Sequence, residues 1–269
     1  MINSQIVKTA YANIYSEPSF NSEMVTQALF FESLKVVSDQ DNWLEVSQWD
    51  GYKGYVHKFY LSSYDSYGEG ELNLTSRYTD LYKDKNFETS VLTVPFGATV
   101  KYYDVIENGY KINIDSKEYY IKQLINSHDL SKRQKVLHYC KMLMGSPYLW
   151  GGKTPFGYDC SGLIQSIYKM VKINFKRDTS DQIQDSRFAS ISVNDAQAGD
   201  IVFFDFEGNG VDHVGIWYGD DMVVHCSGQV KVQSIHDDSN KKLLDYIIDI
   251  KSLDDFLDCL LYTSPSPRD

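Results

Sequence analysis

Cys160, His213 and His225 are the residues whose types and positions most directly suggest chemistry in this chain. Cys160 follows the glycine-containing loop 151–159 and begins a run of apolar residues with helical spacing. The positive end of a helix dipole lowers the pKa of a thiol, so we expect a thiolate nucleophile at this position. A lone cysteine at a helix start is more often a small core residue, so the chemical interpretation also requires a base.

The two histidines lie on strand-like runs joined by a turn signal at 219–221. Alternation places Gly215 on the same face as His213, and we expect it to leave open space where a reacting group can approach. Cross-strand neighbours have Cβ atoms about 5 Å apart, so His225 can orient His213 and fix its tautomer. A histidine pair more often binds metal, but a third and a fourth zinc ligand are not evident. The pattern therefore favours a cysteine nucleophile with a histidine base, and it predicts neither a metal nor another cofactor.

The elements around these residues follow an α+β pattern. Ser131 predicts the N-cap of a helix through Met144, which Gly145-Ser146-Pro147 ends. A second helix is expected to begin near Cys160, because apolar residues recur there at i, i+3 and i+4 spacing. Strand-like runs follow at 200–204, 213–218 and 222–226. Helices followed by antiparallel strands indicate an α+β domain.

The sequence before this segment contains two similar stretches. Asn13-Ile14-Tyr15 is echoed by Asp80-Leu81-Tyr82, and Gly54-Tyr55-Val56 by Tyr119-Tyr120-Ile121, at an offset of about 66 residues. Each stretch predicts short alternating strands separated by turn signals such as Asp50-Gly51. We expect two copies of a small β-barrel, and a single irregular all-β domain is the alternative.

Composition bears on the possible partners of the chain. Of 269 residues, 42% are hydrophobic, which is enough for a core, and the formal net charge is −11. Nucleic-acid binding needs a basic surface, so neither a nucleic acid nor an anionic membrane is expected as a partner. The sequence shows neither a signal-like N-terminus nor an apolar run of membrane-spanning length. We therefore expect a cytoplasmic monomer, or a periplasmic or secreted protein if a signal peptide has been removed.

The four cysteines are Cys140, Cys160, Cys226 and Cys259, and none forms a CxxC pair. Residues 259–269 resemble a translated frame of a sequencing adapter, so we expect this tail to be non-native and the natural C-terminus to be missing. The odd number of cysteines that remains favours a free thiol over a disulfide framework. Cys140 and Cys226 are expected in the core.

Four motifs then carry a family resemblance: GSPYLWGGKTPFGYDCSGLI at 145–164, AGDIVFF at 198–204, DHVGIW at 212–217 and VVHCSG at 223–228. From about Tyr139 to Ile235 the chain resembles the NlpC/P60 family of cysteine peptidases. The resemblance implies a papain-like fold in which Cys160 is the nucleophile, His213 the base and His225 the orienting residue. It also places Tyr148 at the active site, where its hydroxyl and the Cys160 backbone N–H could form an oxyanion hole.

Residues 11–18, 22–29, 43–46 and 50–56 look like a bacterial SH3 domain, and the second copy resembles one more weakly. The expected fold class is α+β, with a C-terminal papain-like NlpC/P60 domain preceded by two small SH3-like β-barrels. The expected domains are 1–64 (first SH3-like domain), 65–126 (diverged second copy) and 127–258 (peptidase), followed by the tail 259–269.

This layout is similar to that of γ-D-glutamyl-L-diamino acid endopeptidases, which cut murein peptides with a free N-terminal L-Ala. By this resemblance, Asp159 and Ser161 flank the nucleophile where substrate binds, and Trp150 matches an aromatic wall. Asp178 matches a carboxylate that helps to hold the substrate amine. A helix cap is the alternative role for Asp178.

Two residues of the first SH3-like domain, Glu23 and Tyr52, are candidates for closing the pocket over the amine. A buried ammonium group needs carboxylate partners, because it otherwise carries a large desolvation penalty. A solvated surface charge is the alternative interpretation of Glu23.

The leading expectation is a cysteine peptidase that hydrolyses the γ-D-Glu–diamino acid bond of murein peptides during cell-wall recycling, with the murein peptide as its partner. An endopeptidase on intact peptidoglycan, anchored by its SH3 domains, is one alternative. An amidase or acyltransferase with the same catalytic trio is another, and a non-catalytic wall-binding module is a third. The preference between lysine and diaminopimelate is left open.

Overall fold

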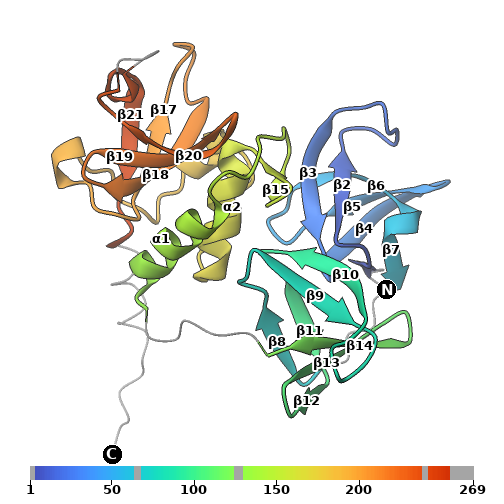
Figure 1. The fold of residues 1–269 in the computed structure, drawn as a ribbon. Coiled ribbons are helices and arrows are strands. Elements are labelled where there is room, and N and C mark those ends of the chain that lie inside the picture. The colour runs from blue at the N-terminus through green and yellow to red at the C-terminus, as the bar shows by residue number, and fades with distance from the viewer. Residues whose placement is uncertain (1–3, 64–67, 124–129, 238–241, 255–269) are drawn as a thin grey trace, which may run out of the picture.

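The computed structural model describes residues 4–63, 68–123, 130–237 and 242–254, and these form three units along the chain (Figure 1). In these four stretches we find no helix with the length and apolar character needed to cross a membrane. The expected adapter-derived tail, 259–269, lies outside the described residues.

The first unit is a single antiparallel sheet. Its strands are β1 (Ser4–Val7), β2 (Tyr11–Tyr15), β3 (Met24–Leu29), β4 (Ser33–Gln40), β5 (Trp43–Ser47), β6 (Lys53–His57) and β7 (Leu61–Ser63), with a 3-10 turn η1 (Lys58–Tyr60). The strand order is β3-β2-β6-β5-β4-β1-β7. The predicted turn at Asp50-Gly51 is present, and Gly51 adopts a φ of 86° there.

The second unit repeats this arrangement. Its strands are β8 (Gly70–Asn73), β9 (Tyr78–Tyr82), β10 (Ser90–Pro95), β11 (Thr99–Tyr102), β12 (Asp104–Ile106), β13 (Gly109–Ile114) and β14 (Lys117–Lys122). The order β10-β9-β14-β13-β12 matches β3-β2-β6-β5-β4, and β8 pairs with β11 as β1 pairs with β4. The recurring order agrees with two copies of one unit. The SH3 identity of the second copy stays a prediction.

The third unit packs helices against an antiparallel sheet. The helices are α1 (Lys132–Leu143), α2 (Cys160–Met170) and α3 (Thr179–Ile183), with 3-10 turns η2 (Val193–Asp195) and η3 (Leu243–Tyr246). The main strands are β17 (Ile201–Phe204), β18 (His213–Gly219), β19 (Met222–Ser227), β20 (Gln229–Ser234) and β21 (Ile247–Lys251), and β15 (Lys153–Thr154) pairs with β16 (Gly157–Tyr158). The sheet order is β20-β19-β18-β17-β21.

Several local predictions for this unit are confirmed. Ser131 caps α1 in a capping box with Gln134, and Met144 follows its last residue. Asp220 and Asp221 have positive φ in the turn between β18 and β19, as a tight hairpin requires. Cys140 and Cys226 are both buried in the core between the helices and the sheet. The predicted runs omitted β20 and β21.

The first unit docks on the third through polar side chains. Gln27 accepts from the Lys153 backbone N–H at 2.8 Å, and Gln165 Nε2 donates to Asp50 Oδ2 at 2.7 Å. A side chain on Gly151, which has a φ of 74°, would lie 2.6 Å from the Met24 carbonyl oxygen. The glycine is therefore required for close packing against β3 of the first unit.

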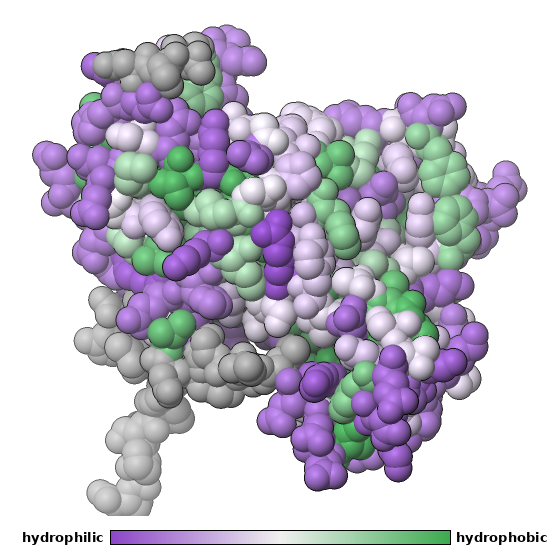
Figure 2. All heavy atoms as spheres, viewed as in Figure 1, coloured by the Kyte–Doolittle hydropathy of each residue, from purple (hydrophilic) through white to green (hydrophobic). Residues whose placement is uncertain are grey.

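The second unit contacts the third through Arg77. Its guanidinium donates to the carbonyl oxygens of Met142 and Met144 and to the Ser146 hydroxyl, at 2.9 to 3.0 Å. These contacts hold the C-terminal end of α1. At the end of the second unit farthest from the other two, hydrophilic residues predominate on the face shown (Figure 2).

Candidate active site

Cys160 is the first residue of α2, as the sequence predicted. Asp159 caps this helix by accepting from the Gly162 backbone N–H at 2.7 Å. Because Cys160 is the first helical residue, its own N–H has no acceptor within the helix and can serve a substrate oxygen. Cys160 is partly exposed as a residue, and its sulfur lies 4.0 Å from the Thr179 hydroxyl of α3.

A buried arginine holds the residues on both sides of the nucleophile. Arg177 is 2% exposed, and its guanidinium donates to the carboxylate of Asp159, to the Ser161 hydroxyl and to the Thr26 hydroxyl of β3. One guanidinium thus connects the first unit to the loop that precedes Cys160. Arg177 was not among the site residues predicted from the sequence, although Asp178 beside it was. The position of Arg177 directly before the candidate carboxylate Asp178 is the sequence feature that could have indicated its role.

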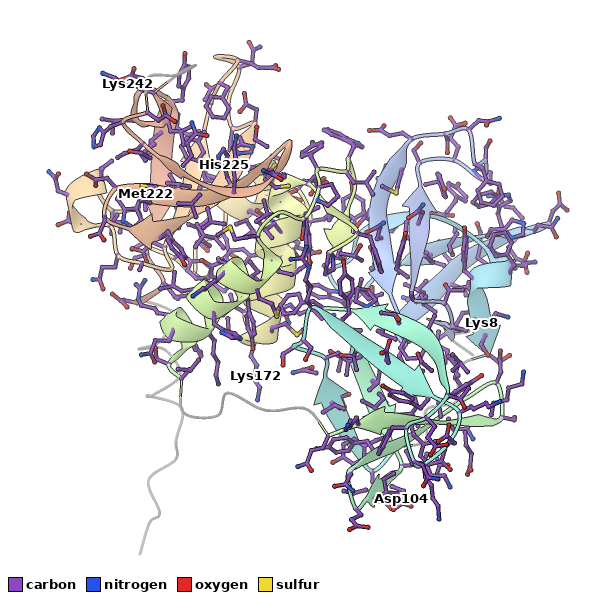
Figure 3. The ribbon with its side chains drawn as sticks, in the orientation of Figure 1. Lys8, Asp104, Lys172, Met222, His225 and Lys242 are labelled. Atoms are coloured by element: carbon purple, nitrogen blue, oxygen red, sulfur yellow. The ribbon has the colours of Figure 1, made fainter. Side chains whose placement is uncertain are left out.

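The histidine pair forms the predicted hydrogen bond. His213 Nε2 and His225 Nδ1 are 2.9 Å apart, and both rings are buried. His225 lies toward the end of β19 nearer the first unit, whereas Met222 lies at the other end (Figure 3). The expected open space at Gly215 is wrong, because a side chain there would lie 2.6 Å from Val223 and 3.2 Å from His225 Cβ. Gly215 faces His225 across the strands and lets the two rings meet diagonally.

Burial sets the ionisation of the catalytic groups. It lowers the pKa of His213 to about 3 and that of His225 to about 4, with Lys231 acting in the same direction. Burial and the Asp159 carboxylate raise the pKa of the Cys160 thiol, and the opposing backbone N–H groups do not compensate. Burial therefore opposes the thiolate that was expected at the helix start. It likewise favours the neutral form of both imidazole rings.

One cavity of about 460 Å³ brings most of the predicted site residues together. It is lined by residues of the first and third units: Glu23, Val25, Tyr52, Tyr148, Trp150, Asp159, Cys160, Ser161, Arg177, Asp178, Thr179, Ser180, Val211, Asp212 and His213. His225 lies behind His213. A larger hollow of about 750 Å³ on the other side of α3 has neither a thiol nor an imidazole in its lining, so the smaller cavity is the candidate active site.

The first unit supplies two groups to this cavity. Trp150 Nε1 donates to Glu23 Oε1 at 2.7 Å, although Trp150 is otherwise 61% exposed. Tyr52 and Asp178 both line the cavity, and burial followed by the charge of the Asp178 carboxylate raises the pKa of Tyr52 to about 12. Asp178 occupies the N-cap position of α3 without a side-chain capping bond. Its carboxylate therefore faces Tyr52 and the cavity rather than the helix.

Tyr148 lies at the rim of the cavity on the segment before the glycine loop. Burial, and then the nearby Cys160 and Asp159, raise the pKa of Tyr148 to about 12. Its hydroxyl therefore stays protonated at neutral pH and can donate a hydrogen bond. Among the described residues we find no group of three or more His, Cys, Asp or Glu side chains that could hold a metal ion, either in this cavity or elsewhere.

The histidine pair predicts a pH dependence of stability. The unfolded state takes up protons below pH 6.5, whereas the folded rings stay neutral down to about pH 4, so stability falls as pH falls through this window. Each ring contributes up to about 1.4 kcal/mol per pH unit. In urea unfolding between pH 6.5 and 4.5, His225→Gln is expected to flatten this slope. His138→Gln, at an exposed position on α1, is the control, and equal slopes in all three proteins would contradict the assignment.

Comparison with known proteins gives a consistent picture. Residues 145–248 match the NlpC/P60 family and residues 10–62 match the bacterial SH3 domain. A gamma-D-glutamyl-L-lysine dipeptidyl-peptidase of Bacillus subtilis is 31% identical over 74% of this chain and 71% of its own length. Dipeptidyl-peptidase 6 of Lysinibacillus sphaericus is 24% identical over 86% of this chain and 91% of its own length. A crystal structure of an NlpC/P60 family protein from Bacillus cereus shares the fold, with a TM-score of 0.78 at 18% identity, covering 93% of this chain and 99% of the other.

Proposed function

Since the chain belongs to the NlpC/P60 family of peptidases, we propose that it hydrolyses the γ-D-Glu–diamino acid bond of murein peptides with a free N-terminal L-Ala. One observation carries the proposal: the thiol of Cys160 and the ring of His213 line the same cavity as the carboxylates of the first and third units. The relatives named as gamma-D-glutamyl-L-lysine dipeptidyl-peptidases support this choice of bond.

The reaction begins with a neutral pair. His213 takes the proton of the Cys160 thiol as the sulfur attacks the carbonyl carbon of the γ-amide, which forms a tetrahedral intermediate. The N–H of Cys160 and the protonated Tyr148 hydroxyl donate to its oxyanion. His213 then gives the proton to the leaving amine of the diamino acid. Water, deprotonated by the same ring, hydrolyses the thioester and releases L-Ala-D-Glu.

The carboxylate end of the cavity accounts for the free N-terminus of the substrate. Asp178 and Glu23 present carboxylates beside Tyr52 and Trp150. A primary ammonium group donates three hydrogen bonds, and its positive charge complements the negative charge of these carboxylates. Peptides still attached to glycan have an acylated L-Ala, so they cannot supply this group.

Product analysis tests the proposed function. Free L-Ala-γ-D-Glu-diaminopimelate and whole sacculi are incubated in parallel with the enzyme, and the released peptides are identified by mass spectrometry. We expect L-Ala-D-Glu and free diaminopimelate from the tripeptide and little release from sacculi. Cleavage of the L-Ala–D-Glu bond, or release from sacculi alone, would contradict the proposal.

One observation favours a second candidate, an endopeptidase on intact wall. The first unit carries a cluster of aromatic side chains in which Phe20 and Phe59 are each 50% exposed; its members are Tyr15, Phe20, Trp43, His57 and Phe59. Exposed aromatic clusters of this kind mark binding surfaces. Binding of sacculi that is lost in Phe20→Ala, together with release from sacculi, would favour this candidate.

A further inference from the structure

His225 has a hydrogen-bonding partner at each ring nitrogen. Its Nδ1 lies 2.9 Å from His213 Nε2, and its Nε2 lies 3.2 Å from the side-chain oxygen Oε1 of Gln233 on β20. His213, His225 and Gln233 therefore form a row of hydrogen-bonded groups that starts at His213, which lines the same cavity as Cys160, and ends at a neutral amide. Gln233 was not predicted as a site residue, because β20 was not among the strands predicted from the sequence.

The sheet register explains how Gln233 reaches the ring. Lys231 lies directly opposite His225, and Gln233 lies opposite Val223, one same-face position farther along. Side chains at such diagonal positions are within reach of one another when one of them is long. Gln233 is partly buried, so its amide is shielded from water on one side.

The hydrogen bonds between Gln233 and His225 and between His225 and His213 determine which nitrogen of each ring carries the proton. An amide oxygen only accepts hydrogen bonds, so Nε2 of His225 must carry a proton. A neutral imidazole has one N–H, so Nδ1 of His225 accepts, and it accepts from Nε2 of His213. The remaining nitrogen of His213, Nδ1, then keeps its lone pair. The low pKa values of both rings agree with the neutral forms that this count requires.

We propose that Gln233 is a positioning residue that fixes the tautomers of both histidines and so leaves Nδ1 of His213 as the atom that takes the proton of Cys160. This inference rests on the proposed peptidase function for its catalytic meaning. During attack, the thiol proton moves to Nδ1 of His213 while its Nε2 proton stays hydrogen-bonded to His225. With the amide of Gln233 turned over, its N–H would donate to Nε2 of His225 and every tautomer would reverse. Nδ1 of His213 would then be protonated and unable to act as a base.

A neutral amide at this position has a different effect from a carboxylate. It orients the ring without adding negative charge, so the pair stays uncharged in its buried position. Other titratable groups around the pair are Lys231 opposite His225 on β20 and, around the cavity, Cys160, Asp159, Asp178 and Asp212. A glutamate in place of Gln233 would favour the protonated form of His225.

Two variants and a matched control separate these effects. Gln233→Leu removes the acceptor, and Gln233→Glu replaces it with a charged one. Gln184→Glu adds the same charge at an exposed position at the end of α3, outside the lining of the cavity. Thermal unfolding verifies that each variant is folded.

Imidazole ¹⁵N NMR reads the tautomers independently of activity. In the wild-type protein we expect Nε2 to be protonated and Nδ1 unprotonated in both rings, and we expect this preference to weaken in Gln233→Leu. In Gln233→Glu the proton affinity of His225 should rise about tenfold or more, which is at least one pKa unit, with no such rise in Gln184→Glu. A protonated Nδ1 on His213 in the wild type, or equal shifts in both glutamate variants, would overturn the inference.

Kinetics on the free tripeptide test the catalytic consequence. We expect Gln233→Leu to lower kcat by about 10- to 100-fold with a smaller change in KM. In Gln233→Glu the acid limb of the kcat/KM profile should move to higher pH. An unchanged kcat and profile in both variants would contradict the inference. If the wild-type enzyme leaves the tripeptide intact, the proposed function fails, while the NMR result still decides the role of Gln233.

Discussion

Replacing Cys160 by alanine is expected to reduce hydrolysis of L-Ala-γ-D-Glu-diaminopimelate by at least about 1,000-fold. Removal of the sulfur eliminates the atom that attacks the carbonyl, and neither Thr179 nor Ser161 can replace it. The hydroxyl of Thr179, in α3, lies 4.0 Å from the position of that sulfur, and the Ser161 hydroxyl already accepts a hydrogen bond from Arg177. The rate is measured from the release of diaminopimelate.

The fold of this variant is expected to persist, because Cys160 is partly exposed and Asp159 still caps α2. Its unfolding free energy should stay within about 1 kcal/mol of the wild type. Cys140→Ala is the matched control: it removes a thiol that is buried in α1 and does not line the cavity, so it should cost stability and leave turnover unchanged. Turnover of Cys160→Ala at the wild-type rate would refute the nucleophile.

Acetylating the amino group of the substrate L-Ala is expected to produce the second large change in rate. We expect kcat/KM to fall by about 100-fold, because loss of the charge-assisted hydrogen bonds to Asp178 and Glu23 costs about 3 kcal/mol. The comparison uses the free and the N-acetylated tripeptide in steady-state assays with the same enzyme.

Asp178→Asn provides the test within the protein. The variant retains the size of the side chain but loses its charge. The kcat/KM for the free tripeptide should therefore fall, and the ratio of kcat/KM between the free and the N-acetylated tripeptide should become smaller. Asp195→Asn, at an exposed position outside both hollows, is the control and should leave the ratio unchanged. Equal rates on both substrates in the wild-type enzyme would remove the argument for an amine pocket.

Local signals in the sequence were sufficient for the elements that carry the nucleophile. The capping pair Ser131 and Gln134, the apolar spacing after Cys160 and the turn at Asp220-Asp221 are each set by neighbours within a few residues. These elements lie where the sequence predicts them, apart from small differences at their ends.

The contacts that complete the site depend on distant parts of the chain. Arg177 is 151 residues from its partner Thr26, and Trp150 is 127 residues from Glu23. Spacing within one sequence does not encode such pairs, so Glu23 and Tyr52 came from the family resemblance, and Arg177 was missed. Spacing also did not reveal that burial raises the pKa of the Cys160 thiol, because this burial comes from the packing of whole units.

Active-site labelling with a substrate mimic tests the central claim most directly. L-Ala-D-Glu carrying a chloromethyl ketone at its γ-carbon places an electrophile where the scissile carbonyl would lie. We predict a single adduct, located by peptide mass spectrometry on Cys160, with complete loss of activity and protection by the free tripeptide. An adduct on Cys140 or Cys226 instead, or an unlabelled protein that still hydrolyses the tripeptide, would contradict the account.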